Sequence, residues 1–346
     1  MAGNLSLRAT IKDVVFTHIP KTAGTSVRNT IAAALPDAVN VFDYGANTDS
    51  VEGKFVNGYK LDARTPEGLI ALRRQVGRGQ RLFACGHVAA AKYLPAFHPA
   101  SFITFLREPV ARVVSAYKHH VKLLNFTGSF TEFYEQPGQI NTQSRLLWGI
   151  DLRDIGFVGL TEYMPDMYAA LSRHLDVELK GRKDNVGSRS GYPEIDESVR
   201  SRILALNAED AELYRHVQSN LDYFTNYRAR KSWSPVLAKG NIHHRSEGNF
   251  QGWAVASSPG WLVEIEVRVG PQVVHRCYAD EFMPRLKEND LSPHGIGGFS
   301  VQLPSHILAG QKQVRFVIAG TDRDLPGSPV ELCIRHSDNS RYPQAP

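Results

Sequence analysis

The sequence predicts an α/β domain, with a parallel sheet flanked by helices, followed by a small antiparallel β-sandwich. Short apolar strands alternate with helical segments over the first two-thirds of the chain, which is typical of a parallel sheet. Beyond residue 240 apolar and polar residues alternate with period two between Gly/Pro turns, which favours an antiparallel sandwich. We therefore expect a first domain at residues 1–230, a linker at 231–240, a sandwich domain at 241–336 and a loose tail at 337–346.

Composition restricts the classes of function. The 346 residues, 42% of them hydrophobic, suffice for one large or two ordinary domains. The net charge of +5 fits an anionic cofactor or an acidic glycan. There is no lysine/arginine block and no DNA- or RNA-binding motif, so nucleic acid is not an expected partner.

Cysteine spacing and hydropathy predict the compartment. Cys85, Cys277 and Cys333 are too far apart for a Cys-x-x-Cys pair, which argues against a disulfide framework and a structural zinc site. The chain has neither an N-terminal signal pattern nor an apolar run long enough to span a membrane. We expect a cytoplasmic protein without an integral membrane segment.

The first predicted strand leads into a turn suited to an anion. The apolar run Val14-Val15-Phe16-Thr17-His18-Ile19 ends at Pro20, and helical spacing begins near Val27. Free amides and the dipole at a helix N-terminus attract an anion, and Lys21 adds a positive charge beside them. The turn also carries three hydroxyl donors, on Thr22, Thr25 and Ser26.

This turn is P-loop-like but differs from the nucleoside-triphosphate P-loop. In that motif the lysine follows the glycines, whereas here Lys21 precedes Gly24. The alternative interpretation is an ordinary strand–turn–helix with a solvated lysine.

The remaining elements of the first domain are expected in chain order. Residues 36–60 are polar and read as a loop or irregular structure. Strands are expected near 81–88, 101–106 and 157–162, and helices near 65–76, 110–124, 130–136, 139–147, 164–175, 197–206 and 208–227. Lys21, His87 and Arg107 each follow a predicted strand. Ligands bind at the carboxyl ends of the strands in such sheets, so these residues define one candidate site.

A second anion motif begins at the end of the third strand. Leu106-Arg107-Glu108-Pro109-Val110-Ala111-Arg112-Val113-Val114-Ser115 places an arginine at the strand end and a serine two turns into a helix. The forked guanidinium of Arg107 and the hydroxyl of Ser115 suit one phosphate held between them. The alternative is a surface pair of Arg107 with Glu108 and an unrelated serine. Arg112 is expected to form a structural salt bridge.

Both motifs resemble those of sulfotransferases that use 3′-phosphoadenosine 5′-phosphosulfate (PAPS), most closely the group containing heparan sulfate 2-O-sulfotransferase. The resemblance covers about residues 13–228. It implies a PAPS-binding sulfotransferase domain that needs no metal and sulfates a hydroxyl of a carbohydrate acceptor. It also implies which residues bind the co-substrate. The 5′-phosphate would be bound by Lys21, Thr22, Ala23, Gly24, Thr25 and Ser26, and the 3′-phosphate by Arg107 and Ser115. Ser188 and Arg189 would belong to a loop that closes over the adenine and the 3′-phosphate.

Histidine is the expected general base, because its ordinary pKa lies near neutral pH. The Gly-His-Val context of His87 resembles the catalytic histidine of the 2-O-sulfotransferase group, and a buried structural histidine is the alternative. Strand alternation predicts that His18 points into the sheet, and His119 and His120 are weaker candidates. The segment from Asn141 to Gly149 also resembles this group, so Gln143 and Arg145 are weak candidates for acceptor contacts.

The C-terminal half resembles small bacterial β-sandwich modules appended to surface-glycan enzymes. Trp253 and Trp261 are candidates for stacking on sugars, although tryptophans more often fill a sandwich core.

Two other functions stay open. One is a non-catalytic glycan- or anion-binding protein with a sulfotransferase-like fold. The other is a nucleotide-dependent kinase, against which the reversed lysine order and the lack of an Asp-rich magnesium motif both argue. The acceptor sugar and the oligomeric state are not determined by the sequence.

Overall fold

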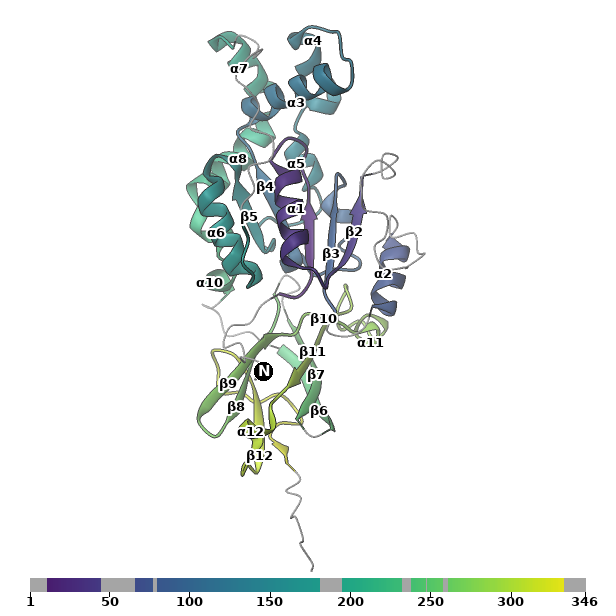
Figure 1. Ribbon diagram of the computed structural model, residues 1–346, viewed down its shortest axis with the longest axis vertical. Coiled ribbons are helices and arrows are strands. Elements are labelled where there is room, and N and C mark those ends of the chain that lie inside the picture. Colours follow the sequence, from purple (N-terminus) through teal and green to yellow (C-terminus); the bar gives the residue numbers. More distant parts are fainter. Residues whose placement is uncertain are drawn as a thin grey trace, which may run out of the picture.

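The computed structural model describes seven segments of the chain, residues 11–44, 66–76, 80–180, 195–231, 238–246, 248–257 and 261–332. A five-stranded parallel sheet forms the centre of the first half (Figure 1). Its strand order is β2-β3-β1-β4-β5, and the strands span Val39–Asp43, Leu82–Gly86, Val14–Thr17, Phe102–Leu106 and Phe157–Leu160.

Strand β2 corrects the prediction of an irregular segment over 36–60. It pairs with β3 as an edge strand of the sheet. Its burial alternates along Val39–Asp43, whereas β1, β3, β4 and β5 are buried throughout. A short edge strand with polar residues between its apolar ones resembles a loop in sequence.

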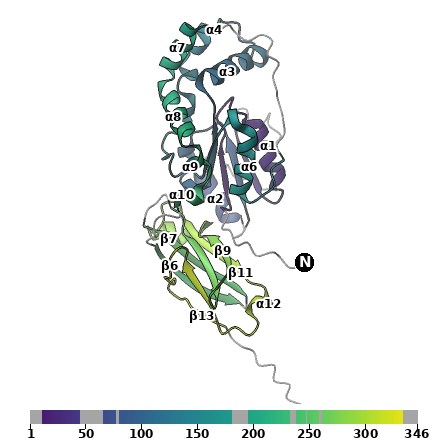
Figure 2. The same ribbon diagram turned by 90° about the vertical axis from the view of Figure 1, so that its left-hand side faces the viewer.

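Helices cover both faces of the sheet (Figure 2). Successive residues of β1 point to opposite faces, so Val14 and Val15 belong to different hydrophobic clusters. Helices α1 and α6 pack on one face, and α8 and α9 contribute to the cluster on the other. The helices of this half are α1 to α10, at Gly24–Ala34, Pro66–Gln75, Pro109–Leu123, Phe130–Tyr134, Thr142–Leu146, Met164–Leu175, Glu197–Leu206, Ala208–Ser219, Leu221–Thr225 and Tyr227–Lys231.

The single helix predicted over 208–227 is instead divided into α8, α9 and the start of α10. Asparagines stand at both breaks, and their side chains bond to the backbone. The Asn220 amide donates to the carbonyl oxygen of His216 (2.9 Å), and Asn226 accepts from the amide of Ala229 (3.1 Å). Such local bonds compete with the helical ones.

The second half contains two four-stranded antiparallel sheets, in the orders β10-β11-β7-β6 and β13-β12-β8-β9. One hydrophobic cluster draws residues from both sheets, and the rings of Phe250 and Phe316 lie 5.2 Å apart within it. The strands β6 to β13 span Ala238–Ser246, Asn249–Ala256, Glu264–Val269, Gln272–Tyr278, Glu281–Phe282, Ile296–Gln302, Gln313–Ile318 and Val330–Glu331.

Two features of this half differ from the sequence expectation. Strand β6 begins at Ala238, inside the expected linker, and two short helices, α11 (Pro284–Glu288) and α12 (Ser305–Leu308), interrupt the strands. Trp253 lies on the face of β7 opposite the buried residues and is half-buried. Residues 232–237 of the linker and the expected tail lie outside the described residues.

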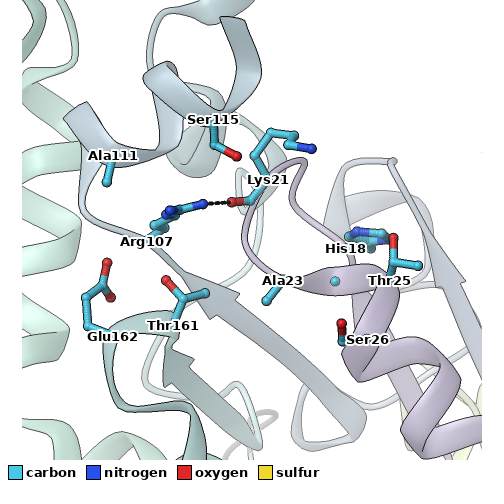
Figure 3. Close-up of a pocket in the computed structure, with 11 residues that line it drawn as sticks. His18, Lys21, Ala23, Thr25, Ser26, Arg107, Ala111, Ser115, Thr161 and Glu162 are labelled. Atoms are coloured by element: carbon cyan, nitrogen blue, oxygen red, sulfur yellow. Dashed lines mark hydrogen bonds between the residues drawn. The ribbon is translucent and has the colours of Figure 1, made fainter. Parts of the chain in front are cut away.

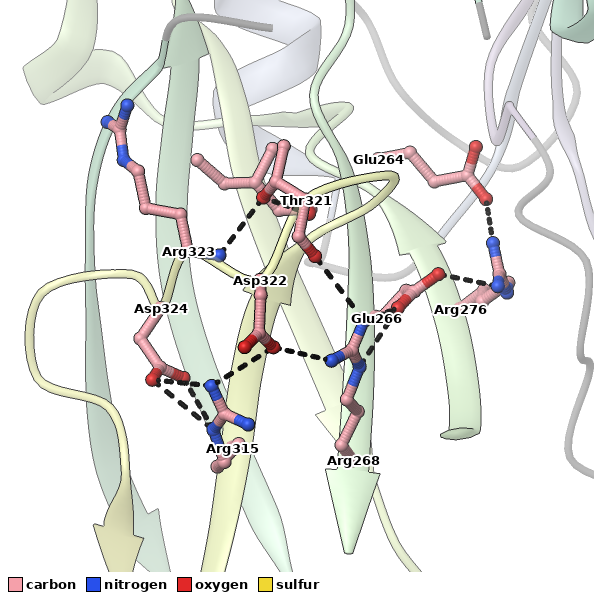
Figure 4. A network of polar contacts seen from close by, with 10 residues as sticks. Glu264, Glu266, Arg268, Arg276, Arg315, Thr321, Asp322, Arg323 and Asp324 are labelled. Atoms are coloured by element: carbon pink, nitrogen blue, oxygen red, sulfur yellow. Dashed lines mark hydrogen bonds and ion pairs between the residues drawn. The ribbon is translucent and has the colours of Figure 1, made fainter. Parts of the chain in front are cut away.

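The outer face of the β8–β9–β12 sheet carries a network of ion pairs (Figure 4). Glu266 pairs with Arg276 (2.5 Å) and Arg268 (2.6 Å), and Arg268 also reaches Asp322 (2.9 Å). Alternate residues of β8 therefore face the core and this network in turn, as expected for a sheet with one solvated face.

The two halves meet at the amino ends of the parallel strands. Lys12, just before β1, donates its backbone amide to Asp280 (2.5 Å) and its side chain to Glu281. Ala100, shortly before β4, shares a hydrophobic cluster with Tyr278. The carboxyl ends of the strands, where Lys21, His87 and Arg107 lie, are therefore not covered by the second half (Figure 1).

In the part of the chain that the structure describes, no helix combines the length and the apolar character needed to cross a membrane.

Candidate active site

Two cavities lie at the carboxyl edge of the parallel sheet. The first has a volume of about 440 Å³ and is bounded by the β1–α1 turn, the start of α3 and the end of β5. The second, of about 310 Å³, lies on the other side of Lys21 and is lined by His87 and by residues of α3 and α5. Three residues line both cavities: His18, Lys21 and Thr25.

The β1–α1 turn has an unusual backbone. Lys21 (φ 71°) and Ala23 (φ 59°) are both left-handed, a conformation that costs a non-glycine residue free energy and is concentrated at functional sites. The hydroxyl of buried Thr22 donates to the carbonyl oxygen of Ile19 (2.9 Å). The Thr22 amide also donates to this oxygen (3.4 Å), and Thr22 lines neither cavity, so it braces the turn and does not face a ligand as the sequence suggested.

Helix α1 begins at the first cavity. Its first helical bond joins the amide of Val27 to the carbonyl oxygen of Ala23 (3.2 Å). The amides of Ala23, Gly24, Thr25 and Ser26 precede this bond at the N-terminus of the helix, and these four residues all line the first cavity. The positive end of the helix dipole adds to their attraction for an anion.

Arg107 and Ser115 lie across this cavity from the turn (Figure 3). Arg107 donates from Nη1 to the carbonyl oxygen of Lys21 (3.2 Å), which ties the two predicted anion motifs together. Burial first, and Arg107 next, lower the pKa of Lys21 from its ordinary value. The structure thus brings the lysine and arginine of both motifs to one cavity.

Gln143 does not face an acceptor, contrary to the sequence expectation. It is fully buried, and both atoms of its side-chain amide bond to the backbone of Arg107. Its Oε1 accepts from the Arg107 amide (2.9 Å), and its Nε2 donates to the Arg107 carbonyl oxygen (2.9 Å). Gln143 therefore fixes the chain direction at the arginine.

Arg145 and Arg112 also differ from expectation. Exposed Arg145 donates to the carbonyl oxygens of Pro137 (3.1 Å) and Gly138 (3.0 Å) and lines neither cavity. Arg112 donates to the carbonyl oxygen of Gln139 (2.6 Å) in place of a salt bridge, and its Nε has no partner among the described residues. Arg112 lines the second cavity, where burial lowers its pKa to about 10.

His87 is exposed and lines the second cavity. Its ring packs against the rings of His18 (4.3 Å between centroids) and Tyr44 (4.7 Å). Part of the side chain is open to solvent, but the rest is enclosed by protein. This burial lowers the pKa of His87 to about 4, and the nearby charges of Arg28, His119 and Lys21 contribute to the shift. The imidazole is therefore neutral at neutral pH and able to accept a proton.

His18 is buried, as strand alternation predicted, and its ring stacks on that of Phe16, two residues earlier on the same face (5.4 Å between centroids). Strand β1 ends at Thr17, but the amide of His18 still donates to the carbonyl oxygen of Gly86 at the end of β3 (3.0 Å), so the period-two rule extends to His18. The buried ring lines both cavities, and its Nδ1 lies 2.8 Å from the Tyr44 hydroxyl. Burial first, then His87, lowers the pKa of His18 well below its ordinary value.

Thr161 and Glu162 line the first cavity and were not predicted. They follow β5 directly, so the rule that pointed to Lys21, His87 and Arg107 also applies to them. Thr161 Oγ1 is buried without a hydrogen-bond partner among the described residues. Such an orphaned polar atom suits a ligand group.

The loop candidates Ser188 and Arg189 lie outside the described residues. His119 and His120 both line the second cavity. Among the residues that the structure describes, no group of histidine, cysteine, aspartate and glutamate side chains forms a set of metal ligands.

Fold and site together define an α/β protein in which a cavity lined by Lys21, Arg107 and the start of α1 adjoins a histidine-lined cavity. No protein-family model and no curated protein matches the chain. Among solved structures, a sulfotransferase from Alicyclobacillus acidocaldarius is similar over 60% of this chain and 97% of its own, at 20% sequence identity and a TM-score of 0.33. Because that likeness is weak, the proposed function rests on the site residues.

Proposed function

We propose that this protein is a PAPS-dependent O-sulfotransferase that acts on a carbohydrate hydroxyl. The observation that carries the proposal is the pairing of two anion subsites across one cavity, tied by the bond from Arg107 to the Lys21 carbonyl oxygen. PAPS has two separate phosphate groups, at its 5′ and 3′ positions, and therefore needs two such subsites.

The residues present fit this co-substrate. The amides at the start of α1, with Lys21, would hold the 5′-phosphosulfate, and Arg107 with Ser115 would hold the 3′-phosphate. The unpartnered hydroxyl of Thr161 would supply a further polar contact to the nucleoside, and Glu162, whose Oε1 accepts from the Glu108 amide (2.9 Å), lines the same cavity. A cavity of about 440 Å³ is within the usual range for small-molecule sites.

The chain's residues then divide the chemistry. PAPS supplies an activated sulfuryl group when bound. His87 takes the proton of the acceptor hydroxyl as the hydroxyl oxygen bonds to sulfur and the bond between sulfur and the 5′-phosphate oxygen breaks. Lys21 neutralises the charge that develops on that phosphate oxygen. Positioning and electrostatics supply most of the rate enhancement in such group transfers.

The second cavity is proposed for the acceptor. Its lining includes Lys21, Arg112 and four histidines, and it includes no carboxylate among the described residues. This lining supports a polar or acidic sugar as the acceptor. We interpret the two antiparallel sheets as a β-sandwich accessory domain. The PAPS-binding domain would span about residues 1–230, and the protein would act in the cytoplasm.

The proposal is tested by calorimetric titration with 3′-phosphoadenosine 5′-phosphate, ATP and adenosine 5′-phosphosulfate. We expect binding of the 3′-phosphorylated nucleotide to exceed that of the other two. Removing a charged hydrogen bond costs roughly 1.5–3 kcal/mol, so Arg107→Ala should weaken this binding by about 10- to 150-fold.

Arg202→Ala is the matched control, because Arg202 is an exposed arginine paired with Glu135 (3.1 Å) and lines neither cavity. It should bind like the wild type. A preference for ATP would favour a kinase, and tight nucleotide binding without turnover of any glycan would favour a binding protein.

A further inference from the structure

The two cavities meet at His18, Lys21 and Thr25, the residues that line both. A group that passes from a nucleotide in the first cavity to an acceptor in the second must cross this junction. Lys21 offers a positive charge there and Thr25 a hydroxyl. His18 is the third residue at this junction, and it has no part in the proton transfer by His87 or the charge stabilisation by Lys21.

One edge of the His18 ring faces the first turn of α1. A Cβ built on Gly24 would lie 1.8 Å from Cδ2 and 2.0 Å from Nε2 of His18. No other residue type fits between them, so the glycine lets this ring edge approach the first turn of the helix. Within the described residues Nε2 has no hydrogen-bond acceptor, while Nδ1 is occupied by Tyr44.

A short chain of contacts behind the ring favours one tautomer of the imidazole. Tyr44 Oη lies 2.8 Å from His18 Nδ1 and 3.2 Å from Cys85 Sγ. Burial raises the pKa of Cys85 to about 12, so its thiol keeps the proton. An imidazole nitrogen is a far better acceptor than a thiol sulfur, so the Tyr44 hydroxyl donates to Nδ1. The ring proton of His18 then resides on Nε2, on the side of the cavities.

We propose that His18 is a further catalytic residue, which donates a hydrogen bond from Nε2 to an oxygen of the sulfuryl group in transfer, and that Tyr44 is its positioning residue. This inference rests on the proposed function. The Nε2 proton stays on His18 throughout, since His87 receives the proton of the acceptor. A neutral donor also avoids repulsion with Lys21, which an imidazolium at the same place would suffer.

The first test separates binding from turnover. His18→Phe keeps a ring that stacks on Phe16 (5.4 Å between centroids, 6° between planes in the wild type) and removes the donor. We expect binding of 3′-phosphoadenosine 5′-phosphate to change less than twofold and kcat for release of that product from PAPS to fall by roughly 10- to 100-fold. His18→Gln, which retains an amide donor, should recover part of the loss. His216→Phe, an exposed histidine that lines neither cavity, should behave like the wild type.

The second test reads the ring directly. In the ¹⁵N spectrum of histidine-labelled protein at neutral pH, the signals lost in His18→Phe should show a proton on Nε2 and a bare Nδ1. Tyr44→Phe should shift these signals toward a mixture of both tautomers. Adding PAPS should move the Nε2 signal more than adding 3′-phosphoadenosine 5′-phosphate does, because only PAPS carries the sulfuryl group.

The outcomes distinguish the two proposals. If wild-type protein binds no 3′-phosphoadenosine 5′-phosphate, the proposed function fails and the role of His18 falls with it. If it binds and transfers sulfuryl groups while His18→Phe keeps full turnover, only the role of His18 is overturned. A proton found on Nδ1 in the wild type, or equal shifts with both nucleotides, would also overturn that role.

Discussion

Replacing Lys21 with methionine is expected to lower the rate of sulfuryl transfer by about 10²–10³-fold. The side chain lines both cavities, so in the proposed reaction its ammonium group would neutralise the negative charge that develops as the bond between sulfur and the 5′-phosphate breaks. Methionine keeps much of the side-chain length and removes the charge. The loss should therefore appear mainly in kcat under saturating PAPS, measured as formation of 3′-phosphoadenosine 5′-phosphate.

Lys122→Met is the matched control. Lys122 is an exposed lysine on α3 that lines neither cavity, so its loss removes the same charge without touching the site. Its turnover should stay near that of the wild type. If Lys21→Met raises KM for PAPS and leaves kcat unchanged, Lys21 only binds the nucleotide, and the stabilisation of the leaving group must be assigned elsewhere.

His87→Ala is expected to reduce kcat by about 10²–10⁴-fold, the usual range for removal of a general base. His119 is the competing base in the second cavity, and its charge also affects His87. His119→Ala should retain most of the activity. The reverse result, full activity in His87→Ala and loss in His119→Ala, would move the base to His119.

The pH dependence of kcat/KM provides a separate test of His87. A base must be unprotonated to act, and the surroundings of His87 lower its pKa to about 4. Activity should therefore stay level as pH falls from 8 to 5, whereas a histidine of ordinary pKa would lose activity below about 6.5. Arg28→Gln removes a positive charge that disfavours protonation, so in that variant the acid limb should move to higher pH.

Local sequence determined much of this protein. The order of apolar run, turn and helix specified β1 and α1 with the anion-binding turn between them, because these elements depend on contacts between near neighbours. The same logic placed Arg107 at the end of β4 and Ser115 on α3. The alternation of strands and helices then indicated which edge of the sheet would collect them.

Only the tertiary structure decided which side chains meet at that edge. The hydrogen-bond partner of His18 is Tyr44, 26 residues away in the chain. Gln143 looked like a ligand contact but bonds to Arg107 across 36 residues, and Thr161 joins the first cavity through the pairing of β5 with β4. Hydrogen bonds and packing between distant segments set these positions, and the spacing of residues along the chain does not encode them.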